Sequence, residues 1–129
     1  MERHPANHIH LIWELLENNG KEQAHASFMK FTSHEFKKEL IANHPKVLEY
    51  FKVENITRKY QFWIRDSLPI ILYTPEVINQ KVDYIHNNPV VNIPSLANST
   101  VDYRFSSANF YENGIDEFGI LTHIEAWYN

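Results

Sequence analysis

The segment 74–89 constrains the fold of this chain more than any other part of the sequence. Thr74 suits the N-cap of a helix, Pro75 suits its first position, and Glu76 complements the positive end of the helix dipole. Because a proline disfavours helical geometry in the residue before it, Pro89 predicts that this helix ends near one of the two asparagines that precede it. The segment therefore predicts one helix with a defined start and a defined end.

The predicted helix carries an apolar stripe and a pair of polar side chains beside it. Ile78, Val82 and Ile85 share the face that we expect to point into the core. Tyr84 and Asn88 are four residues apart and lie together about a quarter-turn to one side. A tyrosine here is also compatible with simple packing, and an asparagine before a proline with simple helix termination.

The stretch 7–13 alternates between apolar and histidine side chains. Ile9, Leu11 and Trp13 face one way and His8 and His10 the other, which predicts a half-buried strand. Two residues apart on a strand, the imidazoles would project from one face about 7 Å apart at the backbone, so that they can converge on one metal ion. The same pattern is compatible with histidines that face solvent or form hydrogen bonds in a groove.

Three further elements follow from the middle of the sequence. Apolar residues at helical spacing predict an amphipathic helix over about 24–43, with a partly basic face. Pro45 suits the first turn of a second, short helix that extends to Phe51. The segment 60–73 is rich in aromatic and β-branched residues, which predicts one bent strand or two short ones.

The C-terminal third gives one clear element and one ambiguous one. Ser106 or Ser107 can cap a short helix that ends at Asn113, with Gly114 as the residue after it. The tail 118–127 is apolar and fits either a strand or a helix.

Length and composition restrict the class of protein. A chain of 129 residues is long enough for one domain with a hydrophobic core. The absence of cysteine excludes disulfides and thiolate metal sites, so any metal must use histidine, carboxylate or amide ligands. No apolar run approaches the roughly 18 to 20 residues that cross a bilayer, and the N-terminus lacks a signal-peptide pattern. We expect a cytoplasmic protein that does not associate with membranes.

The charge is unevenly distributed along the chain. A net charge of -4 argues against a nucleic-acid partner, because phosphate binding usually requires excess lysine and arginine. However, residues 21–65 contain nine basic and five acidic groups, whereas residues 66–129 contain two basic and eight acidic groups. The basic segment fits either a surface that binds DNA or an ordinary solvated helix face.

These residues also carry a resemblance to a known family. His8-Ile9-His10, preceded by Asn7, resembles the HUH motif of the single-tyrosine transposases. A longer and more specific stretch resembles the catalytic helix of the branch called REP-associated tyrosine transposases: Tyr84-Ile85-His86-Asn87-Asn88-Pro89-Val90. Two more segments resemble recurring parts of that branch, namely Phe62-Trp63-Ile64-Arg65-Asp66 and Asp102-Tyr103-Arg104-Phe105-Ser106-Ser107-Ala108. The resemblance covers nearly the whole chain in the right order.

The resemblance implies a fold and a reaction. The fold is α+β, an antiparallel sheet packed by helices with a ferredoxin-like core. The reaction is the cleavage and rejoining of single-stranded or hairpin DNA, in which Tyr84 is the nucleophile and forms a 5′-phosphotyrosine link. His8, His10 and Asn88 are then ligands of a divalent metal, Mg²⁺ or Mn²⁺. A free phenol, with a pKa of about 10, is a poor nucleophile unaided at neutral pH, so the metal has to polarise the phosphate.

Residues that contact the DNA are harder to assign. The candidates for phosphate contacts are Lys30, Lys37, Lys38, Arg65 and Arg104. Three aromatic residues fit either stacking on unpaired bases or packing in the core: Tyr60, Trp63 and Tyr103.

The sequence also departs from the family pattern. Members normally carry a strand–helix–strand segment before the HUH strand, and this chain begins almost at that strand, so we expect a single domain over 1–129 that lacks this segment. The exposed strand edge that results could be covered by a second copy, by an element exchanged between protomers, or by the tail 118–127. We expect a homodimer, because the family resemblance implies that dimers sharing active-site parts are accessible to this fold. Two rival interpretations are a truncated, catalytically inactive remnant that only binds DNA hairpins, and a metal-dependent hydrolase without covalent chemistry.

Overall fold

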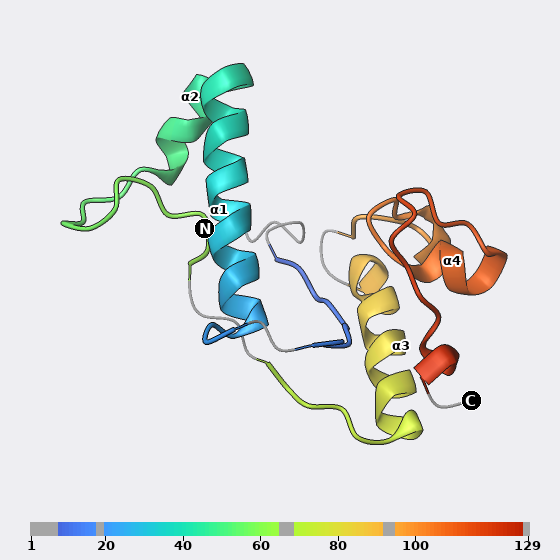
Figure 1. Ribbon diagram of the computed structural model, residues 1–129. Helices are drawn as coiled ribbons and strands as arrows, with labels where there is room; N and C mark the ends of the chain where they lie inside the picture. The colour runs from blue at the N-terminus through green and yellow to red at the C-terminus, as the bar shows by residue number, and fades with distance from the viewer. Residues whose placement is uncertain (1–7, 18–19, 65–68, 92–94, 128–129) are drawn as a thin grey trace. The chain divides into compact units, whose positions relative to one another are not determined.

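The computed structural model describes residues 8–17, 20–64, 69–91 and 95–127, which form helices joined by irregular segments (Figure 1). The chain divides into two compact units. The first unit combines Met1–Trp13 with Ile71–Asn129, and the second unit is Glu14–Ile70. Within the described ranges, no helix combines the length and the apolar character needed to cross a membrane.

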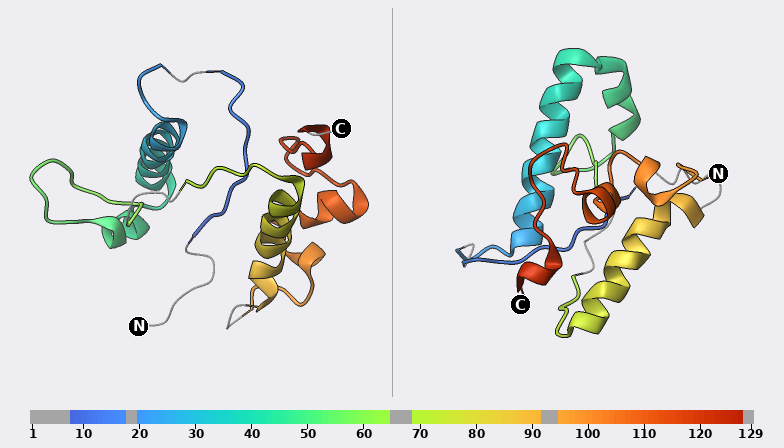
Figure 2. Two further views of the ribbon diagram at one scale, coloured as in Figure 1. Left: turned by 90° about the horizontal axis from the view of Figure 1, so that it is seen from below. Right: turned by 90° about the vertical axis from the view of Figure 1, so that its right-hand side faces the viewer.

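The second unit is built on the long helix α1, Ala24–Asn43, which has the predicted bounds. Helix α2, Pro45–Leu48, and the 3-10 turn η1, Glu49–Phe51, follow at once and confirm the predicted short helix that starts at Pro45. In Figures 1 and 2, α2 lies beside the C-terminal end of α1. Leu48 is the buried residue of α2.

Aromatic side chains hold the chain after η1 against α1. The ring of Phe62 lies 4.9 Å from that of Phe51 and 5.9 Å from that of Phe36, measured between centroids. The indole Nε1 of Trp63 donates a hydrogen bond of 3.0 Å to the hydroxyl of Thr32 on α1. Trp63 thus packs and bonds within the second unit.

The first unit consists of α3, Pro75–Val91, the 3-10 turn η2, Thr100–Asp102, helix α4, Ala108–Asn113, and the 3-10 turn η3, Ile124–Trp127. Its core consists of Ile78 and Val82 on α3 together with Ile124, which is 3% exposed. Four partly buried residues pack against this core, namely Ile12, Leu72, Tyr111 and Trp127. The C-terminal tail therefore folds onto α3, beside which it runs in Figure 1.

The two ends of α3 differ in how well they were predicted. Thr74 caps the helix as expected, since its hydroxyl accepts the backbone N–H of Val77 at 3.2 Å. The predicted C-terminal end is wrong, because the helix continues through Pro89 to Val91. Pro89 is buried, and its carbonyl accepts the amide of Leu96 at 2.8 Å, so packing and this bond outweigh the bias that a proline imposes.

Helix α4 confirms its predicted bounds. Ser107 is its N-cap residue, and Gly114 ends it in the left-handed conformation with φ 73°. The Gly114 amide donates to the carbonyl of Phe110 at 2.9 Å. The hydroxyl of Ser106 accepts the Ala108 amide at 3.2 Å and so satisfies one free donor of the first turn.

The predicted α+β fold with an antiparallel sheet and a ferredoxin-like core is wrong. Neither 8–13 nor the described part of 60–73 forms a strand; residues 65–68 of the second segment lie outside the described residues. Across the described ranges, β pairing amounts to a single antiparallel bridge between Lys52 and Tyr60. Alternation and β propensity describe the two faces of a strand, but a ladder also requires a partner strand, and the described residues supply none.

The apolar face predicted for 8–13 is also wrong. Ile9, Leu11 and Trp13 are 52%, 50% and 45% exposed. Ile12, which was not among the predicted apolar face, instead packs against the core. Without a sheet, the strand period no longer decides which side chains become buried.

Candidate active site

Four of the predicted site residues lie together in the first unit. The imidazole Nε2 of His8 is 3.2 Å from the amide oxygen of Asn88. The rings of His8 and His10 are 5.0 Å apart between centroids, and the ring of His10 is 5.7 Å from that of Tyr84, both at nearly perpendicular angles. We call these four side chains the tyrosine–histidine cluster. Its members come from two segments that are distant in the sequence.

Helix α3 presents Tyr84 and the partly buried Asn88 away from its buried stripe. The buried stripe of α3 consists of Ile78, Val82, His86 and Pro89. This corrects the predicted stripe, in which Ile85 took the place that His86 occupies; Ile85 is only half-buried. Tyr84 remains 60% exposed, so its hydroxyl-bearing ring is accessible to a large substrate.

The environment of His10 favours its neutral form. Burial lowers the pKa of His10 below its usual value, and the nearby His8 lowers it further, because two positive imidazoles repel each other. A neutral imidazole keeps the lone pair that a metal ion requires. The lowered pKa of His10 therefore favours its neutral form at neutral pH.

Two donor atoms of the cluster can be compared with the ligand spacing of a divalent metal. In octahedral coordination with bonds of about 2.1 Å, neighbouring ligand atoms lie roughly 3 Å apart. The 3.2 Å between His8 Nε2 and Asn88 Oδ1 is close to that spacing, although here it is a hydrogen bond in which the imidazole N–H donates to the amide oxygen. Among the described residues, no group of three or more His, Asp or Glu side chains gathers at one point, so a metal at this cluster would need the Asn88 amide as its third donor. Two nitrogens and one oxygen leave positions open for phosphate and water.

His86, which belongs to the tyrosine motif but had no predicted role, links α3 to α4. It is buried, and its Nε2 lies 2.8 Å from the hydroxyl of Ser107 at the start of α4. Its ring also contacts Tyr111, with 5.1 Å between centroids. Burial lowers the pKa of His86, while Asp83 and Glu112 act in the opposite direction. His86 thus fixes the helix that carries Tyr84.

The candidate DNA contacts have different surroundings. Three lysines are exposed on α1 of the second unit, namely Lys30, Lys37 and Lys38. Arg104, in the first unit, forms an ion pair of 2.7 Å with Glu117, and its Nε also donates to that carboxylate. This bond raises the pKa of Arg104 and lowers the pKa of Glu117. The Arg104 guanidinium is therefore already paired with the carboxylate of Glu117. Arg65 lies outside the described residues.

The chain has no significant match among protein-family models, curated proteins or solved structures. Its function is consequently inferred from the geometry of the tyrosine–histidine cluster and from the motifs that the cluster brings together.

Proposed function

We propose that this chain is a single-tyrosine HUH transposase-like enzyme that cleaves and rejoins single-stranded DNA through Tyr84. The observation that supports the proposal most is the meeting of Tyr84 and Asn88 with His8 and His10. The two motifs are separate in the sequence. A nucleophile beside nitrogen and oxygen donors is the arrangement that metal-assisted phosphoryl transfer needs.

In the proposed reaction, the phenolic oxygen of Tyr84 attacks the scissile phosphorus. A bond forms between that oxygen and phosphorus, and the bond from phosphorus to the 3′ oxygen breaks. The phenolic proton passes to water, and the departing 3′ oxygen takes up a proton to become a 3′-hydroxyl. The downstream DNA stays attached to Tyr84 through its 5′ phosphate, and attack by another 3′-hydroxyl reverses the step.

The remaining members of the cluster would hold the metal. His8, His10 and Asn88 would supply two imidazole nitrogens and one amide oxygen, a donor set with open positions. Bound Mg²⁺ or Mn²⁺ would polarise the scissile phosphate and offset the charge that develops on it. His86 takes no part in the chemistry; its bond to Ser107 positions α3.

DNA is the proposed partner, and the cytoplasm is the proposed place of action. The exposed lysines of α1 support an interaction with the phosphate backbone, because lysines that neutralise phosphates release counterions. Binding should therefore weaken as the salt concentration rises.

A covalent-attachment assay tests the proposal. The full chain is incubated with Mn²⁺ and a pool of single-stranded oligonucleotides labelled at the 3′ end, and the products are separated under denaturing conditions. We expect the label to move with the protein, whereas a 5′ label should leave as a shorter free strand. Tyr84→Phe should abolish the attachment. Tyr73→Phe, which removes the hydroxyl of another exposed tyrosine in the same unit, should not.

The same assay separates the rival functions. A remnant that only binds DNA would shift the oligonucleotides in a native gel but attach none of them. A hydrolase without covalent chemistry would release both labels from the protein. Attachment that persists in Tyr84→Phe would place the nucleophile elsewhere and contradict the proposal.

A further inference from the structure

A short hairpin in the second unit, which we call the hairpin arm, spans residues 51–61. Lys52 and Tyr60 form its antiparallel bridge, and the Val53 amide donates to the carbonyl of Lys59 at 3.0 Å. A further bond of 2.8 Å joins the Gln61 amide to the carbonyl of Phe51 at the base. This backbone pairing closes a loop over 54–58.

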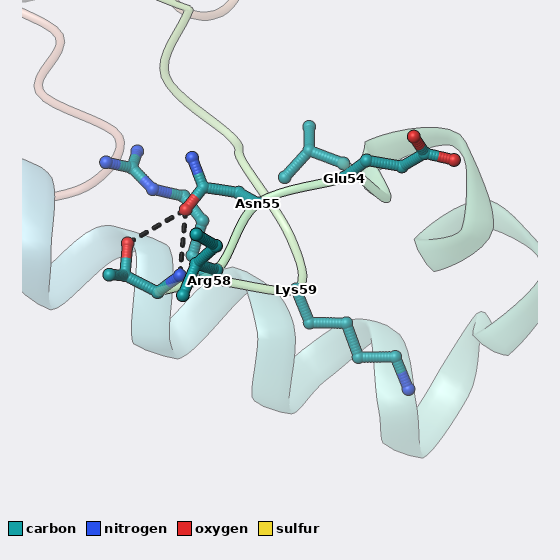
Figure 3. Close-up of a pocket in the computed structure, with 7 residues that line it drawn as sticks. Glu54, Asn55, Arg58 and Lys59 are labelled. Atoms are coloured by element: carbon teal, nitrogen blue, oxygen red, sulfur yellow. Dashed lines mark hydrogen bonds between the residues drawn. The ribbon is translucent and has the colours of Figure 1, made fainter.

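The loop of the arm is also fixed from within. The side-chain oxygen of Asn55 accepts the backbone N–H of Thr57 at 2.8 Å and its hydroxyl at 2.9 Å (Figure 3). This bonding pattern is typical of a tight turn stabilised by asparagine. At the base, Phe51 and Phe62 pack together and Phe62 packs against Phe36 of α1. The arm thus has a fixed base and an ordered tip, and it projects from α1 and α2 in Figures 1 and 2.

The tip of the arm presents an apolar side chain to solvent. Ile56 is fully exposed, with a relative accessibility of 103%. A single exposed apolar residue needs no explanation by itself. Ile56 differs from the others because it stands at the end of a braced hairpin with two cations shortly after it, Arg58 and Lys59.

The cations of the arm are available to an anionic partner. Lys52 is paired with Glu49 at 3.7 Å, but no ion pair within the described residues includes Arg58 or Lys59. Figure 3 shows the carboxylate of Glu54 and the guanidinium of Arg58 on opposite sides of the loop. The ammonium groups of Lys59 and of Lys37 on α1 lie 5.5 and 5.7 Å from the centre of the Tyr60 ring. Lys37 and Lys59 therefore place two positive charges beside Tyr60 at the base of the arm, while Arg58 extends to the other side of the loop in Figure 3.

We propose that the hairpin arm binds DNA at the junction between paired and unpaired strands, with Ile56 inserted against the last base pair. Proteins that open or kink DNA insert an apolar side chain between bases while cations bind the adjacent phosphates. The cations would come from Arg58, Lys59 and Lys37. The hydrogen-bonded backbone of the arm would hold the inserted side chain, which we call the Ile56 wedge, in place. The choice of DNA as ligand rests on the proposed function; the wedge itself rests on the structure of the arm.

A base-unstacking measurement tests this inference. The oligonucleotide is a DNA hairpin with a single-stranded extension and 2-aminopurine in the last base pair of the stem, and the protein is the full chain carrying Tyr84→Phe to prevent cleavage. Binding should raise the fluorescence severalfold as the base unstacks. Adding Ile56→Ala should remove most of that rise while changing the affinity by less than about threefold. The matched control Ile64→Ala, an exposed isoleucine outside the arm, should retain the rise.

The cations give a second measurement on the same DNA. The double variant R58A/K59A should weaken binding and reduce the slope of log affinity against log salt by about two, one for each phosphate that the variant no longer neutralises. The inference is overturned if saturating protein leaves the fluorescence unchanged, if Ile56→Ala keeps the full rise, or if Ile64→Ala loses as much of it. A chain that binds no DNA hairpin overturns it as well, because the tip would then face another kind of partner.

This test and the attachment assay can fail separately. A rise that depends on Ile56, without any covalent attachment to unstructured single strands, would leave the arm in place and contradict the proposed chemistry. Covalent attachment through Tyr84 without an Ile56-dependent rise in fluorescence would leave the proposed chemistry in place and contradict the insertion of Ile56.

Discussion

The two units of the chain differ in charge and in what they carry. The first unit contains three basic and eight acidic residues, whereas the second contains nine basic and eight acidic residues. The tyrosine–histidine cluster belongs to the acidic first unit, while the exposed lysines of α1 and the hairpin arm belong to the second. In the proposed function, the first unit thus supplies the chemistry and the second supplies most of the attraction for the DNA backbone.

The units also differ in how they are held together. The first has a core in which Ile78, Val82 and Ile124 meet from α3 and the tail. In the described part of the second unit, Leu48 is the only buried apolar residue, and half-exposed aromatic rings do the packing. Since stability follows buried apolar surface, we expect local opening to require less free energy in the second unit than in the first.

The largest expected effect concerns the molecular mass. Ile9, Leu11 and Trp13 of the first unit are about half exposed, and segment 8–13 has no strand partner among the described residues. We propose that a second copy covers this segment. Sedimentation at low micromolar concentration should show a dimer or larger assembly. A monomer at all concentrations would contradict this and leave the tail, which already packs with Ile12, as the element that completes the unit.

The next effect concerns the stability of the first unit. Ile124→Ala removes a side chain from the core and should lower the free energy of unfolding by about 3 kcal/mol. Hydrogen exchange should then accelerate in α3 and change little in α1. The matched control Ile120→Ala, whose side chain is exposed, should change stability by less than about 0.5 kcal/mol. Equal acceleration in both helices would mean that the two units unfold together.

A smaller effect is expected on metal affinity. His8→Ala removes one of three donors and should weaken Mn²⁺ binding at least about tenfold, or roughly 1.4 kcal/mol, in a calorimetric titration. His34→Ala, which removes a histidine from α1 in the second unit, is the control and should leave binding unchanged. Equal losses in the two variants would remove the cluster as the metal site.

The smallest expected effect is the contribution of one loop of the first unit to the pH dependence of stability. The Asp116 carboxylate accepts hydrogen bonds from the amides of Gly119 and Leu121, each at 2.9 Å. These bonds lower the pKa of Asp116, and the bond from Leu121 has the largest effect. Because the pKa of Asp116 is lower in the folded than in the unfolded state, its carboxylate stabilises the fold. This contribution to the free energy of unfolding is complete above the unfolded pKa of about 3.9 and is lost as the pH falls through the folded pKa. Denaturant midpoints between about pH 6 and pH 3 should therefore fall more in the wild type than in Asp116→Asn. Parallel curves would show that the loop contributes nothing to the acid sensitivity.

The sequence predicted the helices well because their ends depend on local chemistry. Pro45 and the pair Thr74-Pro75 set the first turns of α2 and α3, and Gly114 ends α4, each through residues that are adjacent in the chain. The sheet was predicted wrongly because pairing depends on distant segments, and alternation around His8 and His10 contains no information on a partner strand.

The candidate site was predicted in part. The motifs around His8 and Tyr84 were sufficient to name side chains that the structure brings together. The structural role of His86 was missed, although its spacing of four and eight residues from Val82 and Ile78 was a visible signal that it shares their buried face. The ion pair that occupies Arg104 depends on a loop conformation that no local pattern specifies.

Mapping the covalent adduct tests the proposed chemistry most directly. The full chain is incubated with Mn²⁺ and single-stranded DNA, digested with nuclease and protease, and analysed by mass spectrometry. We expect a residual 5′-phosphonucleotide on the peptide that contains Tyr84, and none when Mn²⁺ is omitted or when Tyr84 is replaced by Phe. An adduct on another residue, or a chain that binds DNA and Mn²⁺ and yields no adduct, would contradict the claim that Tyr84 is the nucleophile.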